Sequence, residues 1–257
     1  MKQPILEYPG RAKAVLEPLA PRAKDKRLPR RCVLCFFTEV IRKLSRRGEL
    51  ELVKQLHGEG DPIQIHVLGT GRRAVSVCRP GLTAPYATVV LEQLIALGCN
   101  SFIACGGAGV LDGSIEPGRL LLPTAALRDE GTSYHYMQAG RYSRPHPQAV
   151  TAIRKTFAQN NIEFIEGKTW TTDAVYRETP RQVKRRRAEG CLCVDMEAAA
   201  FFAVARFRKV RLGQIFYAGD DVSGPEWDSR NWRKLKKTRE ELFWLAVEAC
   251  RRLPTRL

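Results

Sequence analysis

The sequence feature that most restricts the fold of this chain is the alternation of short apolar runs with longer runs that carry apolar residues at helical spacing. Residues 63–68 and 74–78 alternate apolar with polar or basic side chains, which predicts paired strands. Residues 83–97 have the period of a helix and end at Gly98. Strand and helix patterns that follow one another in this way are typical of a layered α/β fold.

The alternation continues along the whole chain. We expect further strands at 101–105, 120–123, 163–165, 168–171 and 211–218, and further helices at 32–44, 49–56, 149–160, 196–206 and 230–253. The first 30 residues are rich in proline and basic residues and have no clear period. They are therefore expected to form an irregular arm packed on a single domain that spans residues 31–257.

Length and hydropathy set limits on the class of protein. A chain of 257 residues, 44% of them hydrophobic, can bury the core of one sizeable domain. Apolar stretches such as residues 88–97 are interrupted by Glu92 and Gln93 and are shorter than the roughly 18 residues that a membrane span needs. Residues 1–15 lack the apolar block of a signal peptide. We expect a cytoplasmic protein without a membrane partner.

Cysteine spacing and charge each suggest an alternative function. Most of the eight cysteines lie in apolar segments, which favours reduced, buried thiols over disulfides. Cys32 and Cys35 form a C-x-x-C pair, but no second pair lies at metal spacing, so we expect no metal site. The net charge of +16 is concentrated in residues 177–187 and 230–239. Neither segment is a known nucleic-acid-reading motif, and a solvated surface or attraction of anionic substrates explains the charge equally well.

Three polar clusters are predicted to follow strands, where open α/β sheets bind their ligands. They are the glycine-rich segment at residues 106–109, the Asp195-Met196-Glu197 triplet before an alanine-rich helix, and the adjacent pair Asp220 and Asp221. Each has a simpler interpretation when taken alone. These are a tight turn, acidic residues that favour a helix N-terminus, and an Asx turn or helix cap.

Taken together and in order, these segments resemble the nucleoside phosphorylase superfamily, which includes uridine phosphorylases, bacterial-type purine nucleoside phosphorylases and nucleosidases. The resemblance covers roughly residues 64–224 and rests on the following segments: PGLTAPYATVVLEQLIALG, SFIACGGAGVLDGSIEPGRLLLPTAALRDEGTSYHY, TWTTDAVYRE, VDMEAAAFFAVA and GDDVSG. It implies a single three-layer α/β/α domain around a mixed, barrel-like twisted sheet. It also implies homo-oligomers, with sites near subunit contacts.

The resemblance implies a nucleoside phosphorylase that cleaves the N-glycosidic bond of a purine or pyrimidine nucleoside with phosphate, without a cofactor. Glu197 would hold the ribose 2′- and 3′-hydroxyls, with Asp195 and Met196 beside the sugar. Gly106 and Gly107 would border the phosphate and ribose region. Asp221, or alternatively Asp220, would protonate or hydrogen-bond to the leaving base.

Base recognition and the acceptor stay open. Val175 and Tyr176 stand where the family places a Phe-Tyr pair near the base, and Arg181 lies close to the position of a uracil-binding arginine. His135 is a candidate for the ribose 5′ side. Ala104 stands where the phosphorylases usually carry a phosphate-binding arginine. The alternatives are therefore a nucleoside hydrolase that uses water and a non-catalytic nucleoside-binding homologue.

Overall fold

The structure is a computed structural model that describes residues 3–18, 25–58 and 62–255. In these residues ten strands form one sheet. The strands are β1 (Arg31–Cys35), β2 (Leu50–Leu56), β3 (Ile63–Leu68), β4 (Val75–Cys78), β5 (Ser101–Val110), β6 (Leu120–Asp129), β7 (Tyr142–Ser143), β8 (Phe164–Thr172), β9 (Cys191–Asp195) and β10 (Arg211–Asp221). The α-helices are α1 (Thr38–Arg46), α2 (Ala84–Ala96), α3 (Pro147–Gln159), α4 (Pro180–Ala188), α5 (Ala198–Arg208) and α6 (Lys236–Arg252). The 3-10 turns include η3 (Thr132–His135) and η4 (Val175–Arg177).

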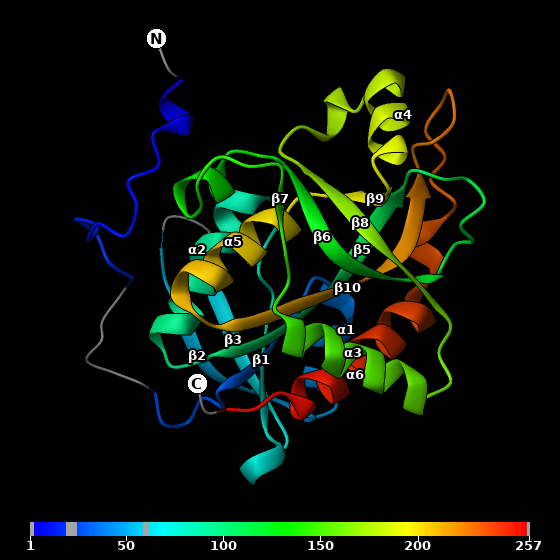
Figure 1. The fold of residues 1–257 in the computed structure, drawn as a ribbon. Helices are drawn as coiled ribbons and strands as arrows, with labels where there is room; N and C mark the ends of the chain where they lie inside the picture. Colours follow the sequence, from blue (N-terminus) through cyan, green and yellow to red (C-terminus); the bar gives the residue numbers. More distant parts are fainter. Residues whose placement is uncertain (1–2, 19–24, 59–61, 256–257) are drawn as a thin grey trace.

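Five of the strands close into a ring. Their order is β5-β9-β8-β6-β10, and the parallel pairing of β10 with β5 completes it. Strands β1, β4, β3 and β2 extend the sheet outward from β5. Parallel pairs such as β1–β5 and β6–β8 coexist with antiparallel pairs such as β5–β9 and β10–β6. The expected mixed, barrel-like sheet is therefore confirmed (Figure 1).

Helices cover both faces of the sheet, which gives two buried cores. Residues of α2 and α5 pack with Phe102 and Phe216 on one face. Residues of α1, α3 and α6 pack with Ile103 and Ile215 on the other (Figure 1). Phe102 and Ile103 are neighbours in β5, and adjacent residues of a strand point to opposite faces. The expected three-layer arrangement follows from this burial on both faces.

Two expected helices are strands in the structure. A helix was predicted over residues 32–44, but residues 31–35 form β1 and the helix α1 covers only 38–46. A second helix was predicted over residues 49–56, where residues 50–56 form β2. The side chains of β1 are buried on both faces, so no alternation of polarity marks it as a strand. In β2 the pairing with β3 overrides an apolar spacing that also fits a helix.

The cysteine prediction is confirmed, since all eight cysteines are buried free thiols. Cys32 and Cys35 lie three residues apart in β1 and belong to the cores on opposite faces of the sheet, so they cannot form a joint redox or metal pair. Within the described residues no cluster of His, Cys, Asp and Glu could hold a metal ion. None of the helices described is long and apolar enough to cross a membrane.

Candidate active site

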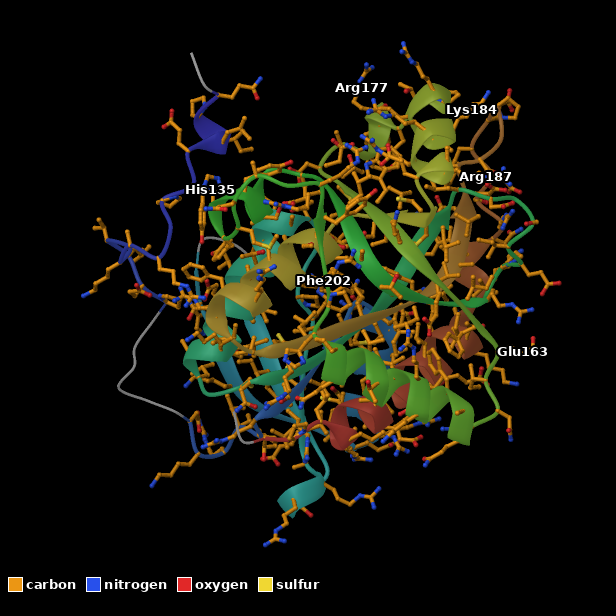
Figure 2. All side chains as sticks on the ribbon, in the orientation of Figure 1. His135, Glu163, Arg177, Lys184, Arg187 and Phe202 are labelled. Atoms are coloured by element: carbon orange, nitrogen blue, oxygen red, sulfur yellow. The ribbon has the colours of Figure 1, made fainter. Side chains whose placement is uncertain are left out.

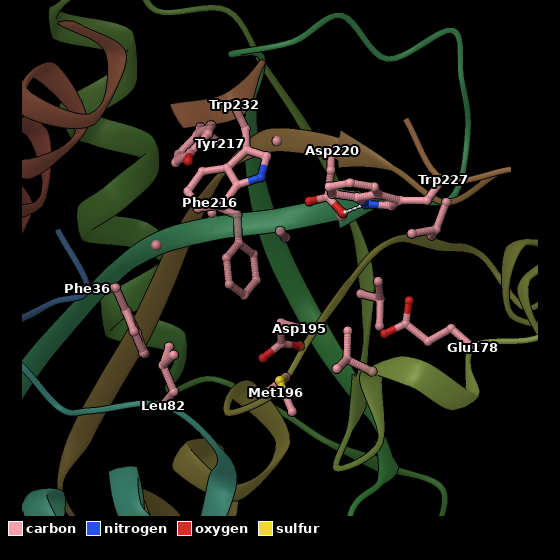
Figure 3. Close-up of a pocket in the computed structure, with 18 of the residues that line it drawn as sticks. Phe36, Leu82, Glu178, Asp195, Met196, Phe216, Tyr217, Asp220, Trp227 and Trp232 are labelled. Carbon is pink, nitrogen blue, oxygen red and sulfur yellow. Dashed lines mark hydrogen bonds between the residues drawn. The ribbon is translucent and has the colours of Figure 1, made fainter. Parts of the chain in front are cut away.

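A cavity of about 860 Å³ lies at the carboxyl ends of β5, β9 and β10 (Figure 3). Its walls bring together the Gly106–Gly109 segment, the Asp195-Met196-Glu197 triplet and Asp220. The three polar clusters that the sequence singled out therefore meet in one place. The rest of the wall is strongly aromatic, and its aromatic residues are Phe36, Phe37, Tyr176, Phe216, Tyr217, Trp227 and Trp232.

Asp195 positions the triplet rather than offering a free carboxylate. It ends β9, and its Oδ2 accepts hydrogen bonds from the backbone N–H groups of Glu197 (2.8 Å) and Ala198 (2.6 Å). Its Oδ1 accepts from the hydroxyls of Thr169 and Thr171, both at 2.9 Å. Four internal donors thus occupy the Asp195 carboxylate, which fixes the turn from β9 into α5.

Glu197 stands at the start of α5 with its carboxylate beside the cavity. Its Oε1 accepts a 2.7 Å hydrogen bond from the backbone N–H of Thr83, a residue with φ of 74°. Burial, followed by the nearby charge of Asp195, raises the pKa of Glu197 to about 8. Hydrogen bonding from the backbone N–H groups of Thr83 and Met196 offsets part of this rise. Once ionised, the carboxylate has lone pairs left to accept hydrogen bonds from two neighbouring hydroxyls of a ligand.

The two aspartates at the end of β10 point to different surroundings. Asp220 lines the cavity, and its Oδ2 accepts a 2.8 Å hydrogen bond from the indole N–H of Trp227 (Figure 3). Asp221 is not part of the cavity wall. It forms an ion pair with Arg230 and accepts from the backbone N–H of Ser223. Of the two aspartates, Asp220 therefore lies in the cavity wall, whereas Asp221, which the sequence interpretation preferred, does not.

Arg230 holds the loop after β10 in place beside the cavity. Besides Asp221, its guanidinium donates to the backbone carbonyls of Gly113 and Ile115. These bonds tie the 222–231 loop to the segment that follows β5. Trp227 is carried by this loop, so Arg230 indirectly places the indole that contacts Asp220.

Glu178 is a cavity residue that the sequence interpretation missed. It follows η4 and lies opposite Asp220 (Figure 3). Burial, and to a smaller extent the charge of Asp220, raises the pKa of Glu178 to about 7. Glu178 is therefore substantially protonated at neutral pH. The only sequence signal was the position of Glu178 two residues after the family's aromatic pair.

The glycine-rich segment is part of β5 rather than a turn, contrary to the sequence interpretation. A Cβ at Gly106 would lie 3.1 Å from the ring of Phe36, and one at Gly107 would lie 2.9 Å from the ring of Tyr217. Both glycines therefore allow aromatic rings to pack against the strand, which is the packing alternative for small residues. Backbone pairing with β10 continues through Gly107.

The remaining candidates divide between the mouth of the cavity and the outer surface. Val175, 46% exposed, and Tyr176, 97% exposed, line the mouth, and Met196 lines the wall. Arg181 is exposed in the first turn of α4 and does not line the cavity. His135 is exposed on η3, at the edge of the molecule and away from the cavity wall (Figure 2).

Arg239 is the one lysine or arginine among the described residues that line the cavity. Its guanidinium carbon lies 5.0 Å from the ring centre of Phe37 and 5.7 Å from that of Trp232. Its Nε forms an ion pair of 2.9 Å with Glu39. Positive charge in the cavity is therefore limited and already partly neutralised.

Comparisons with known proteins show the family to which this fold belongs. The model of the Phosphorylase superfamily matches residues 30–245. A guanosine phosphorylase of Halorubrum lacusprofundi is 31% identical over 141 residues, which cover 55% of this chain and 58% of that protein. A uridine phosphorylase of Haemophilus influenzae is 24% identical over 193 residues, covering 70% and 76%. The crystal structure of purine nucleoside phosphorylase from Toxoplasma gondii in complex with immucillin-H has a TM-score of 0.74 at 16% identity, covering 93% of this chain and 97% of that one.

The closed mixed sheet and the cavity at the ends of its strands thus define an α/β protein of phosphorylase type. The family model covers most of the chain, and this chain belongs to the phosphorylase superfamily. The matched part of the guanosine phosphorylase is a little over half of that protein's length.

Proposed function

We propose that this protein is an enzyme that cleaves the N-glycosidic bond of a purine nucleoside. The observation that carries the proposal is that Glu197 and Asp220 line one cavity. Glu197 accepts the hydrogen bonds of the ribose 2′- and 3′-hydroxyls, and its bond from Thr83 holds the carboxylate in place. The base lies at the end of the cavity formed by Asp220, Glu178 and Trp227.

The reaction breaks the bond between C1′ of the ribose and a nitrogen of the base. Both electrons of that bond leave with the base, and an oxygen of the acceptor forms a new bond to C1′ through an oxocarbenium-like transition state. The Glu178–Asp220 pair supplies a proton to the departing base and regains it from solvent. The pKa of about 7 at Glu178 supports this role, because that carboxyl is substantially protonated at neutral pH.

The hydrogen-bonding character of the cavity favours a purine. Glu178 and Asp220 place two carboxyl groups at the base end, and the raised pKa of Glu178 keeps a proton on that carboxyl near neutral pH. A uracil ring presents two carbonyl oxygens that need donors. Arg181, the donor suggested for uracil, is exposed and outside the cavity wall. The ring nitrogens and N–H groups of a purine fit the two carboxyl groups better.

Inorganic phosphate is the proposed acceptor. The names of the relatives, guanosine phosphorylase and uridine phosphorylase, support it, and Arg239 supplies a cation within the cavity. Water is the second candidate. It is favoured by the buried Ala104 at the position of the family's phosphate-binding arginine and by the ion pair that Arg239 already makes with Glu39.

A nucleoside panel tests the proposal. Guanosine, inosine, adenosine and uridine are incubated with the protein, with and without phosphate, and the released base is quantified by chromatography. Purine release only with phosphate supports phosphorolysis, and release that does not depend on phosphate supports hydrolysis. Saturable binding without base release from any nucleoside would overturn the enzymatic proposal and favour a nucleoside-binding protein.

A further inference from the structure

Gln214 is a buried polar side chain in the cavity wall that has no partner. It lies on β10, is 0% exposed and lines the cavity. Neither its amide nitrogen nor its amide oxygen has a hydrogen-bond partner in the described part of the chain. A buried amide without hydrogen bonds destabilises a folded protein, because it gives up its bonds to water without replacement. Such a group points to a ligand that completes it.

The polar groups around Gln214 do not share this condition. The carboxylate of Asp195 accepts four hydrogen bonds, and the hydroxyls of Thr169 and Thr171 both donate to it. The Glu197 carboxylate accepts from Thr83. The Nε of Arg239, another cavity residue, also lacks a hydrogen bond, but it lies 2.9 Å from its ion-pair partner Glu39. Among the described residues of the cavity wall, Gln214 is the fully buried side chain with no polar atom partnered.

The position of Gln214 separates it from the base. Gln214 and Phe216 point to the same face of β10, since side chains alternate along a strand. Asp220 follows Gln214 by six residues, which corresponds to roughly 20 Å along an extended strand. Phe216 follows Gln214 by two residues, and its ring points toward Asp195 and Met196 (Figure 3). A nucleoside held by Glu197 with its base at Asp220 thus leaves the Gln214 end of the cavity for a second molecule.

The register of the sheet places Gln214 next to Ala104. The two residues pair in the parallel β10–β5 ladder, so their side chains share one face. Ala104 is buried and carries no polar group. The amide of Gln214 is therefore the polar group that this chain offers beside the position where the resemblance predicted a phosphate-binding arginine.

We infer that Gln214 binds the molecule that accepts the ribosyl group: its amide N–H donates a hydrogen bond to an oxygen of that molecule, and its amide carbonyl accepts a hydrogen bond from an O–H group of the same molecule. The inference rests on the proposed function and concerns the shared chemistry of the two acceptors. Monohydrogen phosphate and water both carry an O–H group and an oxygen that accepts. A neutral amide fits this combination because it is both a donor and an acceptor.

The test compares the intact wild-type protein with Gln214→Met, which has similar length and no hydrogen-bonding groups, and with Gln214→Glu, which adds a negative charge. The matched control is Gln138→Met, because Gln138 is exposed and outside the cavity wall. Base release from the best purine nucleoside is measured while phosphate and nucleoside are varied in turn, and thermal unfolding is followed for each variant.

Two results support the inference. If base release requires phosphate, Gln214→Met should lower kcat/KM for phosphate at least tenfold, and Gln214→Glu should lower it further through repulsion of the anion. If release is independent of phosphate, Gln214→Met should lower kcat at least tenfold. In both cases KM for the nucleoside stays within about threefold, and the Tm of Gln214→Met in the absence of ligands equals or exceeds the wild-type Tm.

Other results overturn it. A rise in the nucleoside KM of Gln214→Met with unchanged acceptor kinetics would assign Gln214 to the nucleoside. Kinetics like those of Gln138→Met would leave it a purely structural group. If the wild-type protein releases no base at all, the proposed function fails and this inference with it; the first two results overturn the inference alone.

Discussion

The adjacent residues Asp220 and Asp221 have different contacts, so we expect a substitution of Asp220 to affect activity and a substitution of Asp221 to affect stability. Asp220 faces the cavity and is bonded to Trp227, whereas Asp221 is paired with Arg230. Asp220→Asn should lower kcat/KM for a purine nucleoside about 100-fold, because a general acid of this kind contributes about 10²–10⁴-fold. Steady-state kinetics at saturating acceptor measures the loss.

Asp221→Asn is the natural comparison. It should keep kcat/KM within a few fold but lower stability by about 2 kcal/mol, because the partly buried Arg230 loses its charged partner. For a chain of this size that corresponds to a Tm decrease of about 4–8 °C. If Asp221→Asn lost more activity than Asp220→Asn while remaining folded, the acid would have to be reassigned to Asp221.

Glu197 is the residue on which ribose binding depends in the proposed function. Glu197→Gln keeps an oxygen that can accept from Thr83, but above about pH 8, where Glu197 is ionised, it removes the charge-assisted bonds to two ribose hydroxyls. The kinetics are therefore compared at that pH. We expect kcat/KM to fall about 100-fold or more, since bonds to a charged group contribute about 1.5–3 kcal/mol each. Glu241→Gln, on the exposed side of α6, serves as the control. Unchanged kinetics in Glu197→Gln would remove the ribose role.

At the scale of elements, β5 shows why strand packing depends on glycine here. The Gly107 position is next to Tyr217, which is 2% exposed and therefore has little room to move. Gly107→Ala should destabilise the protein by about 1–3 kcal/mol, the usual range for overpacking. Gly58→Ala is a suitable control because a Cβ there would meet no atom within 4 Å. Equal unfolding temperatures for the two variants would show that Tyr217 yields without strain.

The elements also show what the sequence could and could not predict. Helix α2 was predictable because its apolar residues have the period of a helix and the pattern ends at Gly98. Strands β3 and β4 were predictable because apolar residues alternate with other residue types in their sequences. Strand β1 was not, because it is buried on both faces and its apolar run has no period. The Gly106–Gly109 segment was misread as a turn, because backbone pairing across the closed sheet is a long-range property that local composition does not carry.

Some residues of the candidate site could likewise be predicted from the sequence, and others could not. The positions of Glu197 and Met196 could be predicted because a motif places them at a strand end. Which of Asp220 and Asp221 lines the cavity could not be predicted from the adjacent pair itself. Glu178, Gln214 and Trp227 enter the cavity only through tertiary packing. Gln214 in particular lies within an apolar strand, where its single polar side chain gives no sign of the face to which it points.

At the scale of the whole molecule, several arginines of the two basic segments, residues 177–187 and 230–239, form ion pairs within the protein. Arg186 pairs with Asp129 and Glu189, and Arg187 pairs with Asp112. In the second segment Arg230 and Arg239 pair with Asp221 and Glu39. Other basic side chains of η4 and α4, among them Arg177 and Lys184, point away from the body (Figure 2). Structural pairing therefore explains a part of the charge that nucleic-acid binding was considered to explain.

The buried carboxyl groups give the whole molecule a characteristic dependence of stability on pH. The pKa values of Glu178 and Glu197 rise from 4.5 in the unfolded chain to about 7 and about 8. Between these limits the native state holds more protons than the unfolded state, so the free energy of unfolding decreases as pH rises. His66 and His146 have lowered pKa values and act in the opposite direction, but only below about pH 6.5.

The window from pH 6.5 to 8 lies above the range of the two histidines and contains the pKa values of about 7 and about 8 of Glu178 and Glu197. Asp195 and Glu130 also have raised pKa values, so a variant is needed to separate the contribution of Glu197. Over this window Glu197 alone should remove about 1–2 kcal/mol of stability, which corresponds to a Tm decrease of about 3–6 °C. Glu197→Gln cannot ionise, so its Tm should decrease by that much less than the wild-type Tm between the same two pH values. Differential scanning calorimetry of both proteins at pH 6.5 and 8 makes the comparison. Parallel decreases in the two proteins would mean that Glu197 does not change its protonation between pH 6.5 and 8, since only a group that titrates within the window can steepen the wild-type curve.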